Sequence, residues 1–158
     1  MKTSSKLVTL IGCVFVYLFS IGFAYSVEFP IKPDPVLTPG AVDHTATLDK
    51  VCVVGYTATV RNVPDALKKQ VFAEYHIDPK SDKFEIDHLI SLELGGSNDI
   101  KNLWPQSYTT LPWNAHKKDT LENKLHKLIC DKTITMEEAQ EAIASDWVAA
   151  YQKYVGIK

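Results

Sequence analysis

The sequence is poor in cysteine, in excess positive charge and in repetition, and each shortage excludes a class of protein. Its three cysteines form no CxxC pair, so a structural zinc site built from paired CxxC motifs is excluded. Lys and Arg number 17 against 19 Asp and Glu, which weighs against non-specific binding of nucleic acid through bulk charge. No internal repeat occurs. With 158 residues, 46% of them hydrophobic, the chain suits one globular core.

The N-terminus has the composition of an export signal. Lys2 and Lys6 precede an uncharged run over residues 7–24 that ends in small side chains. We expect residues 1–26 to be a cleaved signal peptide and the protein to be secreted or periplasmic. An uncleaved membrane anchor is the alternative, because this run approaches the roughly 20 residues that span a bilayer. Cleavage would remove two lysines and no acidic residue, and the net charge of −2 would become −4.

Two further segments complete the organisation. Residues 27–48 contain four prolines and no apolar periodicity, which predicts an extended arm, either a tether or a surface wrap, before a domain over 49–158. If Cys13 is removed with the signal, Cys52 and Cys130 remain in an oxidising compartment, and we expect them to form a disulfide. Two buried free thiols are the alternative, which suits a cytosolic protein better.

Apolar spacing predicts three helices and few strands. The helices are expected from Asp65 to before Pro79, from Asn114 onward, and from Thr135 towards Tyr154. Residues 51–60 are rich in β-branched side chains and predict a strand or an extended segment. Residues 84–94 have the length of two short strands, and an irregular stretch through Pro105 and Pro112 follows. Lysines outnumber acids over the helix from 114, so they form either a basic ridge or a solvated face. These lysines are Lys117, Lys118, Lys124, Lys127 and Lys132.

Residues 84–116 contain the most informative pattern of the chain. Asp87-His88, Gly95-Gly96, Asn102-Leu103 and His116 follow one another in a fixed order. This pattern resembles the HNH, or ββα-metal, endonuclease superfamily, and the surrounding sequence resembles a secreted bacterial subgroup of it. The resemblance implies an α+β fold with a small ββα-metal (HNH, His-Me finger) core over 84–130 and flanking helices. Each residue type supplies a part of phosphodiester hydrolysis, which needs an activated water and positive charge at the phosphorane.

The resemblance also implies a role for each motif residue. His88 would be the general base, because an unperturbed imidazole accepts a proton near neutral pH. Asp87 and His116 would bind one divalent metal ion, Mg²⁺ or Mn²⁺ before Zn²⁺ or Ni²⁺. Asn102 would hold the loop backbone and orient His88, with Asn98 as the competing residue for that role. Asp87 and His88 can act on one phosphate only if the strand ends or bulges there, since adjacent strand residues face opposite ways.

Three further residues are candidates for supporting roles. Asp119 and Asn123 share a helical face with His116 and could complete the metal site, while Glu93 could be catalytic or a structural partner of Arg61 or a lysine. We therefore expect an exported, monomeric HNH endonuclease that cleaves DNA and, as a second substrate, RNA. An immunity protein would be its partner if it served as a toxin. The alternative is a catalytically silent, disulfide-bonded module of the same fold that binds nucleic acid or the cell envelope.

Overall fold

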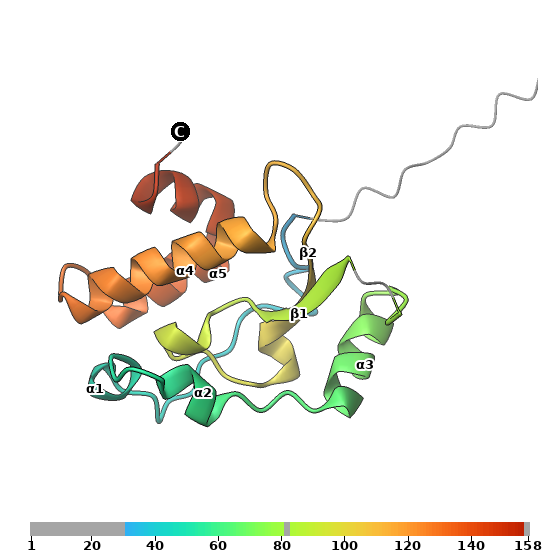
Figure 1. Ribbon diagram of the computed structural model, residues 1–158, viewed down its shortest axis with the longest axis horizontal. Helices are drawn as coiled ribbons and strands as arrows, with labels where there is room; N and C mark the ends of the chain where they lie inside the picture. Colours follow the sequence, from blue (N-terminus) through green and yellow to red (C-terminus); the bar gives the residue numbers. More distant parts are fainter. Residues whose placement is uncertain (1–30, 81–82, 157–158) are drawn as a thin grey trace, which may run out of the picture.

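A small antiparallel sheet lies between α3 and the pair α4 and α5 (Figure 1). The computed structural model describes residues 31–80 and 83–156, and the expected signal peptide lies outside them. Within these ranges helices and strands are mixed, which confirms an α+β protein. No helix in the described part of the chain has the length and hydrophobicity to cross a membrane. The helices and strands, in chain order, are α1 Leu48–Val51, α2 Tyr56–Val60, α3 Asp65–Glu74, β1 Phe84–His88, η1 Leu92–Leu94, η2 Ile100–Asn102, β2 Leu103–Ser107, α4 Ala115–Cys130 and α5 Met136–Tyr154.

The sheet pairs β1 with β2 and not with residues directly after β1. Its register runs from Phe84 opposite Ser107 to His88 opposite Leu103. The prediction of a second strand within 84–94 is wrong, because residues 92–94 form the 3-10 turn η1. The prediction of an irregular stretch through Pro105 is wrong too, since Pro105 lies within β2. A two-stranded sheet gives each strand a free edge, where the missing N–H of a proline is tolerated.

The first two helices replace the strand that β-branched residues predicted over 51–60. α1 and α2 are short, and Gly55 starts α2 with a φ of 84° in the left-handed region that favours glycine. Val51 is buried, whereas Val54 is fully exposed. Side-chain preference for strands depends on a neighbouring strand to pack against, and none lies beside this segment in the described structure.

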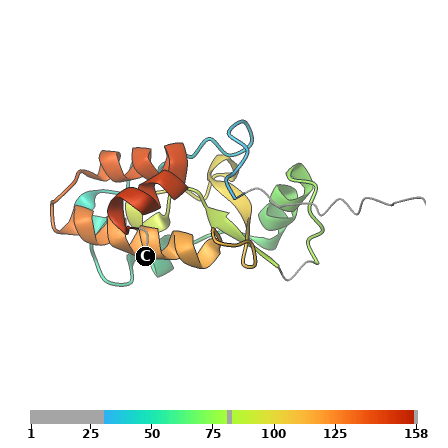
Figure 2. The ribbon, with the colours of Figure 1, turned by 90° about the horizontal axis from the view of Figure 1, so that it is seen from above.

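The three longer helices confirm the predictions from spacing and capping. α3 begins at Asp65, directly after Pro64, and α4 begins after Asn114, whose side chain accepts a hydrogen bond from the Lys117 N–H. Thr135 caps α5 in the same way. α4 and α5 lie side by side along most of their length (Figure 2), and α5 bends at Asp146. Their buried faces meet in the main core, to which α4 contributes Leu121, Leu125 and Ile129 and α5 contributes Ala139, Ile143 and Trp147.

The described part of the proline-rich arm wraps the domain. The Thr38 hydroxyl donates to the carbonyl of Leu103 at 2.8 Å, and the Asp43 N–H donates to the carbonyl of Gly95 at 2.8 Å. Ala46 is part of the core. The segment over 38–46 therefore belongs to the folded domain and covers the end of the sheet.

A disulfide joins α1 to the last residue of α4. The Cys52 and Cys130 sulfurs are bonded, with their Cα atoms 5.7 Å apart and a sequence separation of 78. The predicted pairing is confirmed. It connects the segment before the motif to the far end of the helix that follows it.

Candidate functional site

His88 is the last residue of β1 and is 2% exposed. Its Nε2 lies 3.1 Å from Asn98 Oδ1, and the Asn98 amide nitrogen donates to the carbonyl of Val60 at 2.8 Å. Because this bond fixes which end of the Asn98 amide faces His88, Nε2 donates and Nδ1 keeps the lone pair. Burial lowers the pKa of His88 below its ordinary value of 6.5. The imidazole is therefore neutral, with Nδ1 as its basic nitrogen, at neutral pH.

Asp87 faces the opposite way, towards α4. Its Oδ2 accepts a hydrogen bond of 2.7 Å from the ammonium of Lys118, which also donates to the carbonyl of His88 at 2.6 Å and to Glu122. Lys118 is completely buried. The predicted solvent-exposed lysine face is thus wrong at this position. Lys118 lies three and seven residues before Leu121 and Leu125, and this spacing places it on the buried stripe of the helix.

The Lys118 ammonium donates hydrogen bonds to two carboxyl groups, those of Asp87 and Glu122. Burial acts to lower the pKa of Lys118, but the charges of Asp87 and Glu122 outweigh this effect and raise that pKa above its ordinary value. Burial raises the pKa of Glu122 to about 8, against the opposing effect of Lys118. Glu122 is therefore mostly protonated at neutral pH, and the ammonium of Lys118 balances the charge of Asp87 between β1 and α4.

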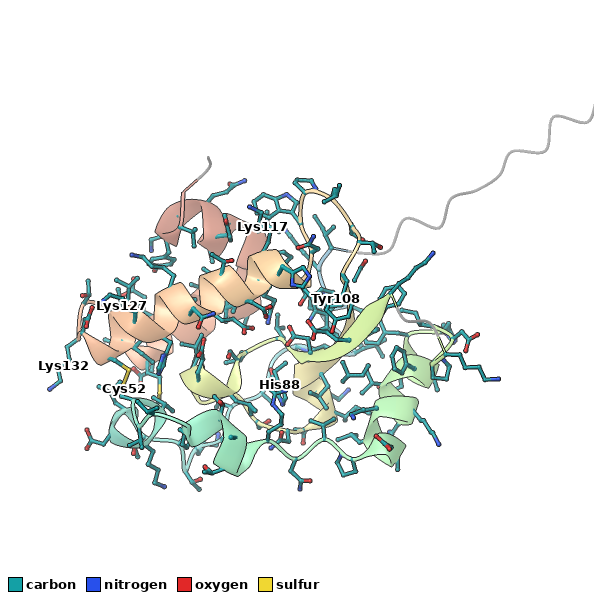
Figure 3. All side chains as sticks on the ribbon, viewed as in Figure 1. Cys52, His88, Tyr108, Lys117, Lys127 and Lys132 are labelled. Carbon is teal, nitrogen blue, oxygen red and sulfur yellow. A yellow bond between two sulfur atoms is a disulfide. The ribbon has the colours of Figure 1, made fainter. Side chains whose placement is uncertain are left out.

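His116 stands at the open side of this acidic region. Its ring lies 5.6 Å from that of Tyr108, and its Nδ1 is 4.0 Å from Asp119 Oδ2. The Tyr108 hydroxyl donates to Glu85 at 2.8 Å. Burial, together with the charge of Asp87, raises the pKa values of both Glu85 and Asp119. Figure 3 shows Tyr108 on the side of β1 nearer to α4 and His88 on the other side.

Asn102 organises the loop between the strands. Its side chain accepts from the Ile90 N–H and donates to the carbonyls of Ile90 and Ser97, each at 2.9 Å. Gly96 lies against the same turn, where a Cβ would come within 1.8 Å of the Ile90 carbonyl oxygen. The side chain that contacts the His88 ring is that of Asn98. The two tasks expected of Asn102 are therefore divided between two asparagines.

No family model, curated protein or solved structure gives a significant match to this chain. The resemblance to HNH endonucleases consequently depends on the motif residues and their arrangement.

The donors beside His116 fit a hard divalent cation that keeps water ligands. Asp87, Asp119 and His116 offer carboxylate oxygens and an imidazole nitrogen, which are ligand types that a divalent cation accepts. They do not converge as three ligands within 4.8 Å of one another in the described residues, so water would complete the coordination. Asn123 is not directed to His116, because its amide donates to the carbonyl of Asp119 at 2.7 Å.

Glu93 has a different partner from those expected. Its Oε2 lies 3.9 Å from Nδ1 of His126, a residue of α4 that lies one turn before Cys130. Burial raises the pKa of Glu93, opposed by the charge of His126. Neither Arg61 nor a lysine is within ion-pair distance of Glu93 among the described residues.

Proposed function

We propose that this protein is an exported HNH-type endonuclease that hydrolyses phosphodiester bonds in DNA, with RNA as the second substrate to test. The observation that carries the proposal is the neutral His88 at the end of β1, oriented by Asn98 through Nε2. This arrangement leaves Nδ1 as the base. The Asp87 carboxylate belongs to the neighbouring residue of the same strand end and faces Lys118 on α4.

The residues of the chain would divide the reaction as follows. His88 Nδ1 takes a proton from the attacking water, and Asn98 keeps the imidazole in the required tautomer. Lys118 positions Asp87 and the strand end through its bonds to the Asp87 carboxylate and the His88 carbonyl. Asp87, Asp119 and His116 would hold the divalent ion, which stabilises charge on the phosphorane and the leaving oxygen when bound.

A second candidate is a silent module of the same fold that binds without cutting. Two observations favour it: His88 is 2% exposed, and one oxygen of Asp87 is already occupied by Lys118. A substrate would have to reach Nδ1 past the residues that cover it. A protein of this kind would retain affinity for nucleic acid and lack cleavage.

Plasmid nicking distinguishes the two candidates. The purified protein with its disulfide formed is incubated with supercoiled DNA in Mg²⁺, Mn²⁺, Zn²⁺ or EDTA, beside His88→Ala and the exposed control His44→Ala. If the protein is an endonuclease, we expect DNA cleavage that requires the metal, persists in His44→Ala and is lost in His88→Ala. Binding without cutting of DNA or RNA in every metal supports the silent module instead.

A further inference from the structure

The disulfide lies beside a histidine on the same helix. His126 is one turn before Cys130, and its Nε2 lies 3.4 Å from the Cys130 sulfur and 2.9 Å from the carbonyl of Val51. Cys52, His126 and Cys130 each offer a ligand atom, and the three atoms lie within 4.8 Å of one another. All three side chains are partly buried. Figure 3 shows Cys52 near the end of α4 opposite to Tyr108, so this group is separate from the acidic region.

The other nitrogen of His126 faces a carboxylate. Its Nδ1 lies 3.9 Å from Glu93 Oε2, and both side chains are mostly covered. A histidine that ligates a metal through one nitrogen commonly donates its other N–H to a carboxylate, which fixes the ring and raises its basicity. The geometry around His126 therefore has both parts of such a site: two sulfurs near Nε2 and an acid near Nδ1.

We propose that the dithiol form of this protein binds one Zn²⁺ through Cys52, Cys130 and His126 Nε2, with Glu93 orienting the imidazole. A dithiol reductant gives two electrons and two protons to the disulfide, breaks the S–S bond and is itself oxidised to a disulfide. Zn²⁺ then displaces both thiol protons. These two protons pass to solvent. The imidazole proton moves from Nε2 to Nδ1, where it stays on the ring and donates a hydrogen bond to Glu93, and the bond from Nε2 to the Val51 carbonyl is released. This inference does not depend on the proposed nuclease function.

Two thiolates and one imidazole suit Zn²⁺ better than Mg²⁺, which prefers oxygen ligands. Three protein ligands leave the fourth tetrahedral position to water. In this form the metal links α1 to α4 at the place where the disulfide links them. Reduction would then exchange one connection between these helices for another and leave the fold closed.

Metal titration of the reduced protein tests the proposal. The full chain carries Cys13→Ser, so that only Cys52 and Cys130 supply thiols, and it is reduced with dithiothreitol and desalted without oxygen. Co²⁺ is added as the spectroscopic probe, and Zn²⁺ affinity follows from displacement of Co²⁺. We expect one equivalent with tetrahedral visible bands and a thiolate charge-transfer band, and none for the oxidised protein.

Variants of His126 and of Glu93, which lies beside its Nδ1, complete the test. Glu93→Gln should weaken Zn²⁺ binding about 10-fold or more, and His126→Ala by more than about 100-fold, while His44→Ala should bind as the parent chain does. Circular dichroism reports the fold of each reduced variant, and refolding on addition of Zn²⁺ supports the site. A reduced chain that binds no Co²⁺, folded or unfolded, overturns the proposal. Equal affinity of His126→Ala and the parent also overturns it.

Discussion

Replacement of Lys118 by methionine tests how the strand end is held. Methionine fills a similar volume but removes the ammonium that donates to Asp87, Glu122 and the His88 carbonyl. Lys118 is 0% exposed, so water cannot replace these bonds without disturbing the core. Breaking a buried ion pair by removing one partner costs about 3–5 kcal/mol, because the other charge stays buried. We expect a loss of this size in the free energy of unfolding at pH 7.

Urea unfolding monitored by circular dichroism measures the loss, with Lys124→Met as the control for an exposed lysine on the same helix. The triple variant Asp87→Asn, Lys118→Met, Glu122→Gln should recover most of the stability, since it leaves no buried charge. A loss below about 1 kcal/mol in Lys118→Met would refute the account of Lys118 as the buried cation of this site.

Three other predictions follow from single contacts. Because burial lowers the pKa of His88, the acid limb of the pH profile of kcat/KM should lie below pH 6.5, and a limb above that value would contradict the burial argument. For the same reason the parent should lose stability relative to His88→Gln as the pH falls below 6.5. Asn102→Ala removes three hydrogen bonds, two of them fully buried, and should cost about 3 kcal/mol in urea unfolding, whereas Asn98→Ala should mainly reduce activity. Replacing Cys52 and Cys130 by serine opens a loop of 78 residues and should cost about 4 kcal/mol, and an unchanged urea midpoint would refute that contribution.

The helices were predictable because their signals are local. Asn114 and Thr135 cap α4 and α5 as their residue types predict, and Pro64 precedes the start of α3. The sheet was not predictable in detail, because β1 pairs with a segment that begins 15 residues after its last residue and includes Pro105. The 51–60 segment has strand-like composition, but its surroundings provide no strand to pair with in the described structure.

The candidate site was predictable in its residues and only partly in their contacts. Asp87 and His88 are the last two residues of β1, but their side chains still face opposite ways, towards Lys118 and Asn98 respectively. The partner of Asp87 is Lys118, and spacing from Leu121 could have identified it as buried. The choice between Asn98 and Asn102 could not be made from sequence, because both precede β2 and only the folded loop directs one of them to His88.

Single-turnover cleavage of duplex DNA in Mg²⁺ tests the central claim most directly. The account predicts that His88→Ala lowers the rate by about 100-fold or more, the range for loss of a general base, and that His44→Ala changes it by less than about twofold. It also predicts that both variants unfold as cooperatively as the parent. Equal cleavage by His88→Ala and the parent, or no cleavage by the folded parent on DNA or RNA in any divalent metal, would contradict it.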